Sequence, residues 1–493
     1  MERSSGILMH ISSLPNRFGI GALGREAYAY VDFLARAGQR YWQLLPMGPT
    51  GYGDSPYQLF SSFAGNPYFI DIGLLIEEGL LTEDEARPHL CPVDADGVDY
   101  GGLHARRFGL LRLAFQRGRH REEAAQAAFA KENAAWMADY ALFMALKAHF
   151  GMAPFTEWPA DIRMREAGAL DYYRGLLSEE AAFYAYTQYL FFRQWRAFRA
   201  YAQAQGVRLI GDLPIYVALD SADVWARPDI FQLGEDRRPL WVSGVPPDYF
   251  TADGQLWGNP VYDWEALAKS DYGWWLDRIR GATRLYDALR IDHFRGLESY
   301  WRVKAGESTA RDGEWAKGPG LDFIKAVQRE FPALPIIAED LGYLTPEVHQ
   351  LVADSGYPGM KVLQFAFDAR EPSGYLPHAY PRNCVCYTGT HDNTTAAGWF
   401  SEAAREDVAF ARRYLNLNEK EGFAWGLIRG GMSSVADLFI AQMQDYLGLP
   451  AAARMNIPGT IGDNWRWRMR PGAASPALAD KIAVYTKMYG RCK

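Results

Sequence analysis

The sequence predicts an α/β fold, namely a (β/α)8 TIM barrel with large insertions after its second and third strands. Short runs of apolar, β-favouring residues alternate with long helical patterns along almost the whole chain. Eight such runs are present, and a helical segment follows the eighth, as a barrel that closes on itself requires. The same alternation occurs in doubly wound open sheets, which remain the alternative architecture.

The start of the chain predicts a βαβ unit. Residues 6–12 form a first strand, residues 25–37 a helix and residues 41–46 a second strand. The helix has apolar side chains one turn apart, and Gly38 follows it in the position of a C-terminal cap. Its apolar stripe consists of Tyr30, Phe33, Leu34 and Ala37.

Six further runs complete the predicted barrel. They are residues 207–217, 285–292, 334–339, 361–367, 384–388 and 453–456. The last predicted helix has Ser475 as its N-cap, Pro476 in its first turn and Gly490 just beyond its end. This order of residues is typical of a complete helix with both termini defined.

The connections between the predicted strands differ greatly in length. Long segments follow the second and third strands, and structureless loops of such length are uncommon in compact domains. We therefore expect one catalytic barrel over residues 1–493 with two inserted subdomains, residues 58–170 and residues 218–283. Helices are expected at residues 131–150 and 178–204. The insertions follow the carboxyl ends of strands, which is the face where barrel active sites lie.

Composition and charge argue against several classes of partner. The chain has a formal net charge of −7 and no long block of like charges, which argues against nucleic acid and anionic membranes. A stretch of about 20 apolar residues, as a membrane-spanning helix requires, is absent from the sequence. Aromatic residues make up 14%, and although most belong in the core, such rings also suit the faces of sugars. We expect a soluble, cytoplasmic protein.

The cysteines and a glycine-rich segment do not predict a metal or cofactor site. Cys91, Cys384, Cys386 and Cys492 lack the paired spacing of zinc ligands, so we expect free thiols in a reducing compartment. Residues 19–24 have the spacing GxGxxG. However, a loop separates them from the preceding strand, and no acidic residue follows at the distance of a dinucleotide site. We predict a loop shaped by glycines, no cofactor and no metal.

A charged pair lies at the end of the predicted fourth strand. Alternation along a strand places Arg290 and Asp292 on one face, and His293 follows directly. A guanidinium nearby favours the ionised carboxylate, so we expect Arg290 to hold Asp292 charged and oriented. The nucleophile of a retaining glycosidase needs both properties, although a structural ion pair would show the same pattern.

Two more carboxyl groups end predicted strands. Apolar residues precede Glu339, so partial desolvation would raise its pKa, as a general acid requires. Asp340 points to the opposite face, so only one of the two can serve. His391 and Asp392 follow the predicted seventh strand, where a carboxylate could bind sugar hydroxyls and stabilise a positively charged transition state. Three acidic strand ends on one barrel face indicate glycosidic chemistry.

Eight segments of the chain resemble one known family, the amylomaltases or 4-α-glucanotransferases, over essentially its whole length. They are residues 48–57, 211–217, 244–250, 257–260, 290–296, 338–342, 389–393 and 454–456. The resemblance implies a barrel of the α-amylase superfamily and a retaining double displacement. In that reaction Asp292 forms a covalent glucosyl-enzyme, Glu339 protonates the leaving oxygen and Asp392 stabilises the transition state.

The resemblance also implies substrate-binding residues. Those expected around the sugar of the cleaved bond are Ser55, Tyr57, Asp212, Arg290, His293 and His391. Residues 244–260 match the loop on the acceptor side, with contacts expected from Tyr249, Phe250, Gln255, Trp257 and Asn259, and from Phe365 nearby. Tyr52 and Tyr100 match aromatic residues of a second, non-catalytic glucan site. One difference is the run from Thr394 to Ala397, where relatives commonly have another Asp; it affects the hydrogen bonding behind Asp392, not its role.

The activity implied by the resemblance is transfer of an α-1,4-glucan segment from one maltooligosaccharide to the 4-hydroxyl of another. Amylose would be a further donor and glucose an acceptor. Two alternatives remain from the residues. A plain α-glucan hydrolase would have the same three carboxyls, because they do not distinguish water from a sugar. A glucan-binding scaffold without activity would have no need of a proton donor at Glu339.

Overall fold

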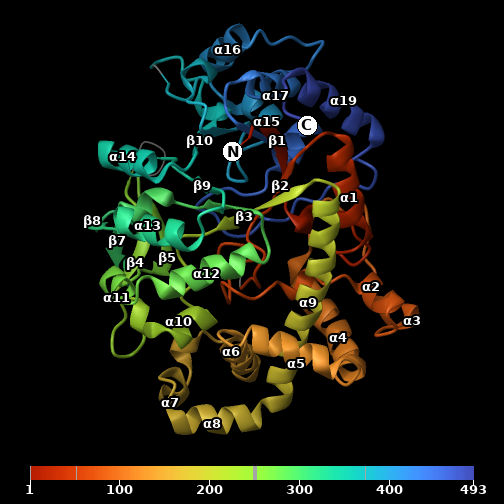
Figure 1. Ribbon diagram of the computed structural model, residues 1–493, viewed down its shortest axis with the longest axis vertical. Coiled ribbons are helices and arrows are strands. Elements are labelled where there is room, and N and C mark those ends of the chain that lie inside the picture. Colours follow the sequence, from red (N-terminus) through yellow and green to blue (C-terminus); the bar gives the residue numbers. More distant parts are fainter. Residues whose placement is uncertain (1, 52, 248–251, 343, 372, 493) are drawn as a thin grey trace.

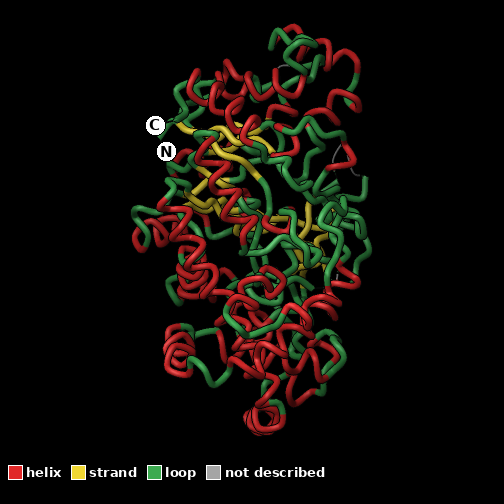
Figure 2. Tube along the Cα trace, turned by 90° about the vertical axis from the view of Figure 1, so that its right-hand side faces the viewer, coloured by secondary structure: helices red, strands yellow, loops and turns green. Residues whose placement is uncertain are grey.

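The computed structural model describes residues 2–51, 53–247, 252–342, 344–371 and 373–492. Eight parallel strands form its main sheet, and they follow one another around the sheet in chain order. They are β1 (Ser4–Leu8), β2 (Tyr41–Gln43), β3 (Arg208–Leu213), β6 (Ala288–Ile291), β9 (Ile336–Ala338), β10 (Gly359–Val362), β11 (Cys384–Tyr387) and β12 (Leu438–Gln442). Helices surround these strands (Figure 2).

The sheet closes into a barrel at two places. β12 pairs with β1 over its full length, from Ser4 opposite Leu438 to Leu8 opposite Gln442. Between β9 and β10, the Ala338 N–H donates to the Pro358 carbonyl at 3.0 Å. The fold is therefore the predicted (β/α)8 barrel, and the open-sheet alternative is wrong.

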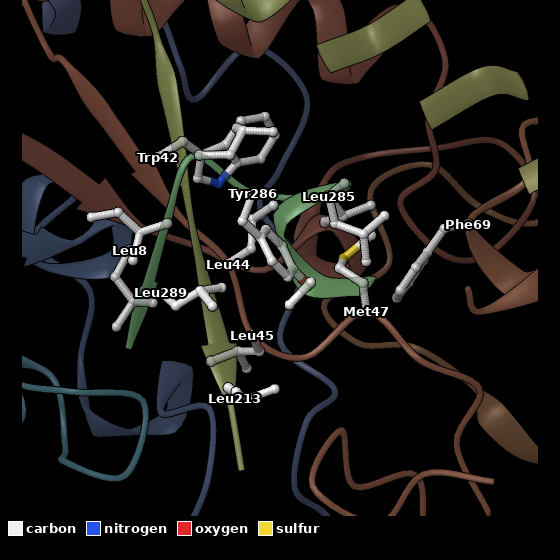
Figure 3. Packing of buried hydrophobic residues seen from close by; sticks show 14 of the residues in the cluster. Leu8, Trp42, Leu44, Leu45, Met47, Phe69, Leu213, Leu285, Tyr286 and Leu289 are labelled. Atoms are coloured by element: carbon white, nitrogen blue, oxygen red, sulfur yellow. The ribbon is translucent and has the colours of Figure 1, made fainter. Parts of the chain in front are cut away.

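Large apolar side chains pack on and between the barrel strands, among them Leu8, Leu44, Leu45, Leu213 and Leu289 (Figure 3). Trp42 points away from the barrel axis, because its ring packs against Tyr30 and Phe198 of the surrounding helices, with centroids 4.7 and 5.9 Å away. Tyr286 packs directly against the backbone of Gly211, where a Cβ would lie 2.1 Å from its ring. Any larger residue at position 211 would displace this ring, so the glycine beside Asp212 has a packing function.

Helices connect most of the strands, as the alternating pattern predicts. The helices that immediately precede a strand or end the chain are α1 (Arg25–Arg36), α9 (Ser178–Ala204), α12 (Gly273–Thr283), α13 (Gly320–Glu330), α14 (Pro346–Ser355), α17 (Phe423–Ser433) and α19 (Pro476–Met488). The Ser475 hydroxyl accepts the Leu478 N–H and Pro476 is the first helical residue of α19, so this helix begins as predicted. In the described part of the chain, β10 and β11 are joined by two short 3-10 helices only, η7 (Leu363–Phe365) and η8 (Pro377–Ala379).

The long segment between β2 and β3 is helical and lies at the bottom of Figure 1. It contains α2 (Ile72–Glu77), α3 (Glu83–Ala86), α4 (Tyr100–Gly118), α5 (Glu123–Glu132), α6 (Met137–His149), α7 (Ala160–Arg163) and α8 (Ala167–Leu176) before α9. The helix expected at residues 131–150 is therefore shorter than predicted, because α5 ends and α6 begins within it. The subdomain boundaries at residues 58–170 and 218–283 stay predictions.

A second sheet was not anticipated from the sequence. Its four antiparallel strands have the order β5-β4-β7-β8, and they lie together at the left-hand side of Figure 1. β4 (Trp241–Val245) and β5 (Gln255–Pro260) come from the connection between β3 and β6, which also holds α10 (Ala222–Ala226) and α11 (Trp264–Lys269). β7 (Ser299–Lys304) and β8 (Gly313–Lys317) follow β6. The sheet thus joins the segment after the third barrel strand to the segment after the fourth.

The predicted eighth strand is wrong. Residues 453–456 form no strand; instead, Ala451–Ala453 is a short 3-10 helix, η9, and the eighth strand is β12. All five residues of β12 are buried, so its sequence is a continuous apolar run. Such a run cannot be distinguished from a buried helix by periodicity, and a helical turn, α18 (Met443–Tyr446), follows it directly.

The GxGxxG segment forms a closely packed loop, as predicted. A Cβ on Gly21 would lie 1.8 Å from the Ile11 carbonyl oxygen, and one on Gly24 would lie 2.2 Å from the Asp71 carboxylate. The start of α1 is thus filled by the chain itself, and this geometry does not fit a bound pyrophosphate. Among the described residues, no helix combines the length and apolar character needed to cross a membrane.

Candidate active site

Three predicted catalytic carboxyls lie at the same end of the barrel. Asp292 directly follows β6, Glu339 directly follows β9, and Asp392 lies in the loop after β11. Because all eight strands are parallel, their carboxyl ends share one face, which is where active sites of this fold are built. β6 and β9 are neighbours in the sheet, so Asp292 and Glu339 come from adjacent strands.

Arg290 connects carboxyl groups from three strands. Its Nη1 donates to both oxygens of Asp212 on β3 at 2.7 Å, and the same nitrogen lies 2.9 Å from Oδ1 of Asp292. Its Nη2 lies 4.0 Å from Oε2 of Glu339. The side chains of Arg290 and Asp212 are essentially buried, whereas that of Asp292 is 27% exposed. Asp292 is therefore oriented by a buried guanidinium and still accessible.

Burial separates the pKa values of the two central carboxyls. Desolvation raises the pKa of Asp292 to about 6, although the Arg290 guanidinium opposes this shift. The predicted effect of Arg290 is thus present in direction, but burial outweighs it. Desolvation, together with the nearby negative charge of Asp292, raises the pKa of Glu339 to about 8 against the opposing Arg290. At neutral pH, Asp292 is mainly ionised and Glu339 mainly protonated, which is the division of labour expected of nucleophile and acid.

Glu339 is held by the backbone of two loops. Its Oε2 accepts the His293 N–H at 2.6 Å, and its Oε1 accepts the Leu341 N–H at 2.9 Å. His293 reaches this position with a left-handed backbone at φ 49° and ψ 47°, which is unusual for a residue other than glycine. Asp340 turns to the other side and accepts the Met360 N–H at 2.6 Å, so the two adjacent acids do point to opposite faces.

The ring of His293 is half-buried and neutral. Burial lowers the pKa of His293 to about 3, with a smaller contribution from the charge of Arg295. The edge of the Trp257 indole meets this ring, with centroids 4.8 Å apart at an interplanar angle of 87°. His293 therefore offers a fixed, uncharged polar group next to Glu339.

Asp392 is positioned by the segment that follows β12. The Asn456 amide donates to Oδ1 of Asp392 at 2.6 Å, and Nε2 of His391 lies 3.3 Å from the same oxygen. The Arg454 guanidinium donates to the Asp392 carbonyl and, at 2.7 Å, to that of Asn456. Asn456 and Arg454 belong to a segment that the sequence analysis matched to the family without giving them a role.

Tyr57 connects Asp212 to His391. Its hydroxyl donates to Oδ2 of Asp212 at 2.8 Å, and its ring stacks on that of His391 with centroids 5.1 Å apart. The Ser55 hydroxyl accepts the Tyr57 N–H at 3.2 Å. The structure thus brings Tyr57, Asp212 and His391 together with the carboxyls. Ser55 is linked to this group through its hydrogen bond with Tyr57.

Comparison with known proteins identifies the family. A sequence profile described as 4-alpha-glucanotransferase matches residues 9–474 of the chain. The chain belongs to this family. It is 47% identical over 487 residues to the 4-alpha-glucanotransferase of Clostridium butyricum, covering 98% of this chain and 100% of the relative. The 4-alpha-glucanotransferase of Thermus thermophilus is 49% identical over 488 residues, covering 97% and 96%.

A solved structure agrees with this assignment. The amylomaltase of Streptococcus agalactiae, determined in complex with acarbose, superposes with a TM-score of 0.97 at 42% identity, and the match covers 100% of both chains. The chain is therefore a glycosyl-transferring enzyme of the 4-alpha-glucanotransferase, or amylomaltase, family with a TIM-barrel fold. The predicted recognition, fold class and activity are confirmed.

The residues predicted on the acceptor side differ in their surroundings. Trp257 lies against His293, and its Nε1 donates to Gln255 at 3.2 Å. Asn259 is buried, and its amide already bonds the Val217 carbonyl at 2.8 Å and the Gln58 amide at 3.3 Å. Its amide is therefore engaged by residues outside the loop of residues 244–260. Tyr249 and Phe250 lie outside the described residues.

The contacts described for Phe365 and Tyr100 are with residues other than the three carboxyls. Phe365, at the end of η7, is 45% exposed and meets the edge of Tyr375 with centroids 5.8 Å apart. Tyr100 begins α4 and donates to the Trp465 carbonyl at 3.1 Å. Its partner in the predicted second glucan site, Tyr52, lies outside the described residues, so that site stays a prediction.

The residue that anchors the loop containing Asp392 was not predicted from the sequence. Asp445, fully buried after β12, accepts the Thr388 hydroxyl and the Ala396 N–H, both at 2.6 Å. These two bonds hold the two ends of the loop that carries His391 and Asp392. No sequence signal marks this role, because Asp445 is remote in the chain from both partners. Within the described residues, no group of three or more His, Cys, Asp or Glu could hold a metal ion.

Proposed function

We propose that this enzyme transfers α-1,4-glucan segments between maltooligosaccharides by a retaining double displacement, with Asp292 as nucleophile and Glu339 as acid and base. The observation that carries this proposal is the pair of carboxyls on adjacent strands, held by one guanidinium and separated in pKa by burial. A retaining mechanism needs one ionised and one protonated carboxyl at the same bond.

In the first step, the ionised Asp292 attacks the anomeric carbon while the glycosidic C–O bond breaks. The proton of Glu339 passes to the leaving oxygen, and the shortened glucan departs with a new hydroxyl. In the second step, Glu339 removes the proton from the 4-hydroxyl of an acceptor, which displaces Asp292 from the sugar. Both carboxyls end in their initial protonation states, so the cycle is balanced.

The other contacts around the carboxyls suggest which residues bind the reacting sugar and which bind the acceptor. We assign Asp392, oriented by Asn456 and His391, to the hydroxyls and the developing positive charge of the reacting sugar. We assign the neutral His293 and the Tyr57 hydroxyl to hydrogen bonds with the same sugar, and Ser55, Asp212 and Arg290 to positions behind them. We assign Trp257 and Gln255 on β5, with Phe365, to the acceptor side.

The substrate range forms part of the same proposal. Maltooligosaccharides and amylose would be donors, and glucose would be an acceptor. The acarbose complex of the Streptococcus agalactiae amylomaltase supports a sugar ligand at this site. We also place the enzyme in the cytoplasm, on the basis of the free thiols of its four cysteines.

Incubation with maltotriose tests the proposal. Transfer produces a ladder of longer oligomers together with glucose, which thin-layer chromatography resolves. Glucose and maltose alone would mean that water is the acceptor, and unchanged maltotriose would mean that the carboxyls catalyse neither reaction.

A further inference from the structure

One tryptophan differs from all the others in its exposure. The sequence contains 16 tryptophans, and all lie in the described residues. Fifteen are buried or half-buried, whereas Trp315 on β8 is 42% exposed. Single exposed apolar residues are common on protein surfaces, so the case for a function rests on how this indole is held.

Trp315 is held in a fixed orientation. The Arg295 guanidinium lies 4.0 Å from the centre of its ring, and the Trp301 ring meets it at 69° with centroids 5.3 Å apart. Trp301 is in turn fixed by a hydrogen bond from its Nε1 to the Ala310 carbonyl at 2.8 Å, and it is paired with Trp315 across β7 and β8. One face of the Trp315 indole is therefore covered, and its solvent-exposed surface is preorganised.

This ring is connected to the catalytic loop. Arg295 is buried in the 3-10 helix η6 (Phe294–Leu297), two residues after His293, whose backbone N–H holds Glu339. β9, which carries Glu339, lies between β6 and β10 in the barrel. The exposed Trp315 contacts Arg295 in the segment that follows β6, and the exposed Phe365 lies in the segment that follows β10. In the order of the barrel strands, the two exposed rings thus belong with the strands on either side of the one that precedes Glu339.

We propose that Trp315 forms a distal acceptor-side site, at which one glucose ring of a long α-1,4-glucan stacks on the open indole face. This inference rests on the proposed function, because the leaving and incoming glucans lie on the side of the acid. Flat apolar rings with one covered face suit the C–H faces of sugars, and the cation behind the ring fixes it without occupying its open side.

The surroundings of Trp315 favour a sugar over a protein partner. Its strand neighbours include Glu314 and Lys317, whose side chains are 51% and 80% exposed. Within the four described strands of the small sheet, no other large apolar residue is exposed. A single ring in polar surroundings is too small for a stable protein interface, but its size matches one glucose unit.

The test compares short and long acceptors on a donor that cannot itself accept. A maltotriosyl fluoride lacking its terminal 4-hydroxyl serves as donor, and fluoride release is followed with glucose or maltoheptaose as acceptor. Trp315→Ala should raise the KM for maltoheptaose about three- to tenfold, the size of one ring contact, while kcat and the KM for glucose stay within about twofold. Trp315→Phe, which keeps a ring against Arg295, should give an intermediate KM.

Tyr172→Ala is the matched control, because Tyr172 is also an exposed aromatic residue, 63% exposed on α8. It should leave both KM values unchanged. An unchanged KM for maltoheptaose in both Trp315 variants would overturn the inference. So would an equal loss with glucose, which would indicate damage to the catalytic loop through Arg295. A change of oligomeric state in sedimentation without any effect on acceptors would identify β8 as a protein interface instead.

A readout without turnover separates this inference from the proposed function. If the wild-type enzyme fails to transfer, the mobility of each variant in native gels containing amylose still reports glucan binding. Weaker retardation of Trp315→Ala than of wild type and Tyr172→Ala supports the glucan site. Equal retardation of all three proteins overturns it.

Discussion

At the scale of single residues, desolvation raises the pKa of both Asp292 and Glu339, and the distances from Arg290 follow the order of the two values. The Arg290 guanidinium lies near three carboxyl groups, and its charge does not outweigh the effect of burial on the pKa of Asp292 or Glu339. Asp292, at 2.9 Å, has its pKa raised only to about 6, whereas Glu339, at 4.0 Å, has its pKa raised to about 8. The more distant group is therefore the one that keeps its proton at neutral pH.

Asp292→Asn tests the nucleophile. Asparagine keeps the shape and the neighbours of Asp292 but cannot form the covalent intermediate. We expect the fold and glucan binding to persist and the rate of maltotriose turnover to fall at least about a thousandfold, which corresponds to about 4 kcal/mol of barrier. A variant that retains a tenth of the wild-type rate would remove Asp292 from the chemistry.

The two pKa values predict a bell-shaped dependence of kcat/KM on pH. Below about pH 6 Asp292 becomes protonated and loses its nucleophilic charge, and above about pH 8 Glu339 loses the proton that it must donate. Activity should therefore be highest between these values. Initial rates with a maltooligosaccharide across pH 4 to 10 measure both limbs.

The variant Glu339→Gln assigns the alkaline limb. It should abolish transfer from maltooligosaccharides, whose leaving oxygen needs a proton, and spare more of the first step with a glycosyl fluoride, whose leaving group does not. The remaining fluoride release should no longer decline above pH 8. Equal losses on both donors, or a persistent alkaline limb, would contradict an acid role for Glu339.

At the scale of elements, we expect β5 to influence which acceptor reaches the glucosyl-enzyme. Its Trp257 is half-buried against His293, so removing the indole would open the acceptor side to water without touching a carboxyl. We expect Trp257→Ala to remain folded and to cleave donor, with a several-fold higher ratio of hydrolysis to transfer. The ratio of glucose released to oligomers formed from maltotriose measures this effect.

Two other outcomes would reject this role for β5. If hydrolysis and transfer fall together with the melting temperature, the indole only packs the small sheet onto the barrel. If a well-folded variant keeps the wild-type product ratio, Trp257 does not influence the choice between water and sugar.

Elements were predictable from the sequence where a local pattern decides their structure. The helix expected at residues 178–204 agrees with α9 in both bounds, because this run of 27 residues contains no Gly or Pro that would interrupt it. β12 was missed because its five buried residues carry no alternation. The small sheet was missed because β4 pairs with β7, a strand far from it in the chain. Between them lie β5, the helices α11 and α12, the barrel strand β6 and the 3-10 helix η6.

At the scale of the whole molecule, the same contrast applies to the active site. Asp292, Glu339 and Asp392 could be found from the sequence, because each follows an apolar strand and a parallel barrel gathers such positions on one face. The residues that support them could not, since Asp445 and Asn456 contact the loop around Asp392 from 57 and 64 positions away in the chain. Local sequence identifies chemistry at strand ends, and tertiary structure supplies the residues that orient it.

The closure of the barrel depends on a residue near the C-terminus. Arg491, after α19, is 1% exposed, and its guanidinium donates to five backbone carbonyls around the starts of β1 and β12. The two shortest of these bonds, at 2.7 and 2.9 Å, reach Met432 and Ser4. The first and the last barrel strands are thus joined by one buried cation as well as by their own pairing.

Arg491→Ala should therefore destabilise the whole barrel while leaving the carboxyls untouched. It removes five charge-assisted hydrogen bonds and a large buried side chain, which costs about 3 kcal/mol in the free energy of unfolding. The loss is limited because Arg3 still donates to the carbonyls of Met432, Ser434 and Ala436. Arg36→Ala is the matched control, because Arg36 joins α1 to α19 through an exposed ion pair with Asp480, a kind of contact that contributes little. Urea unfolding followed by tryptophan fluorescence should show a large shift of the midpoint for Arg491→Ala and almost none for Arg36→Ala, with kcat/KM of the folded protein unchanged in both. Similar small shifts for the two variants would show that strand pairing alone closes the barrel and that the buried guanidinium only fills space between the strands.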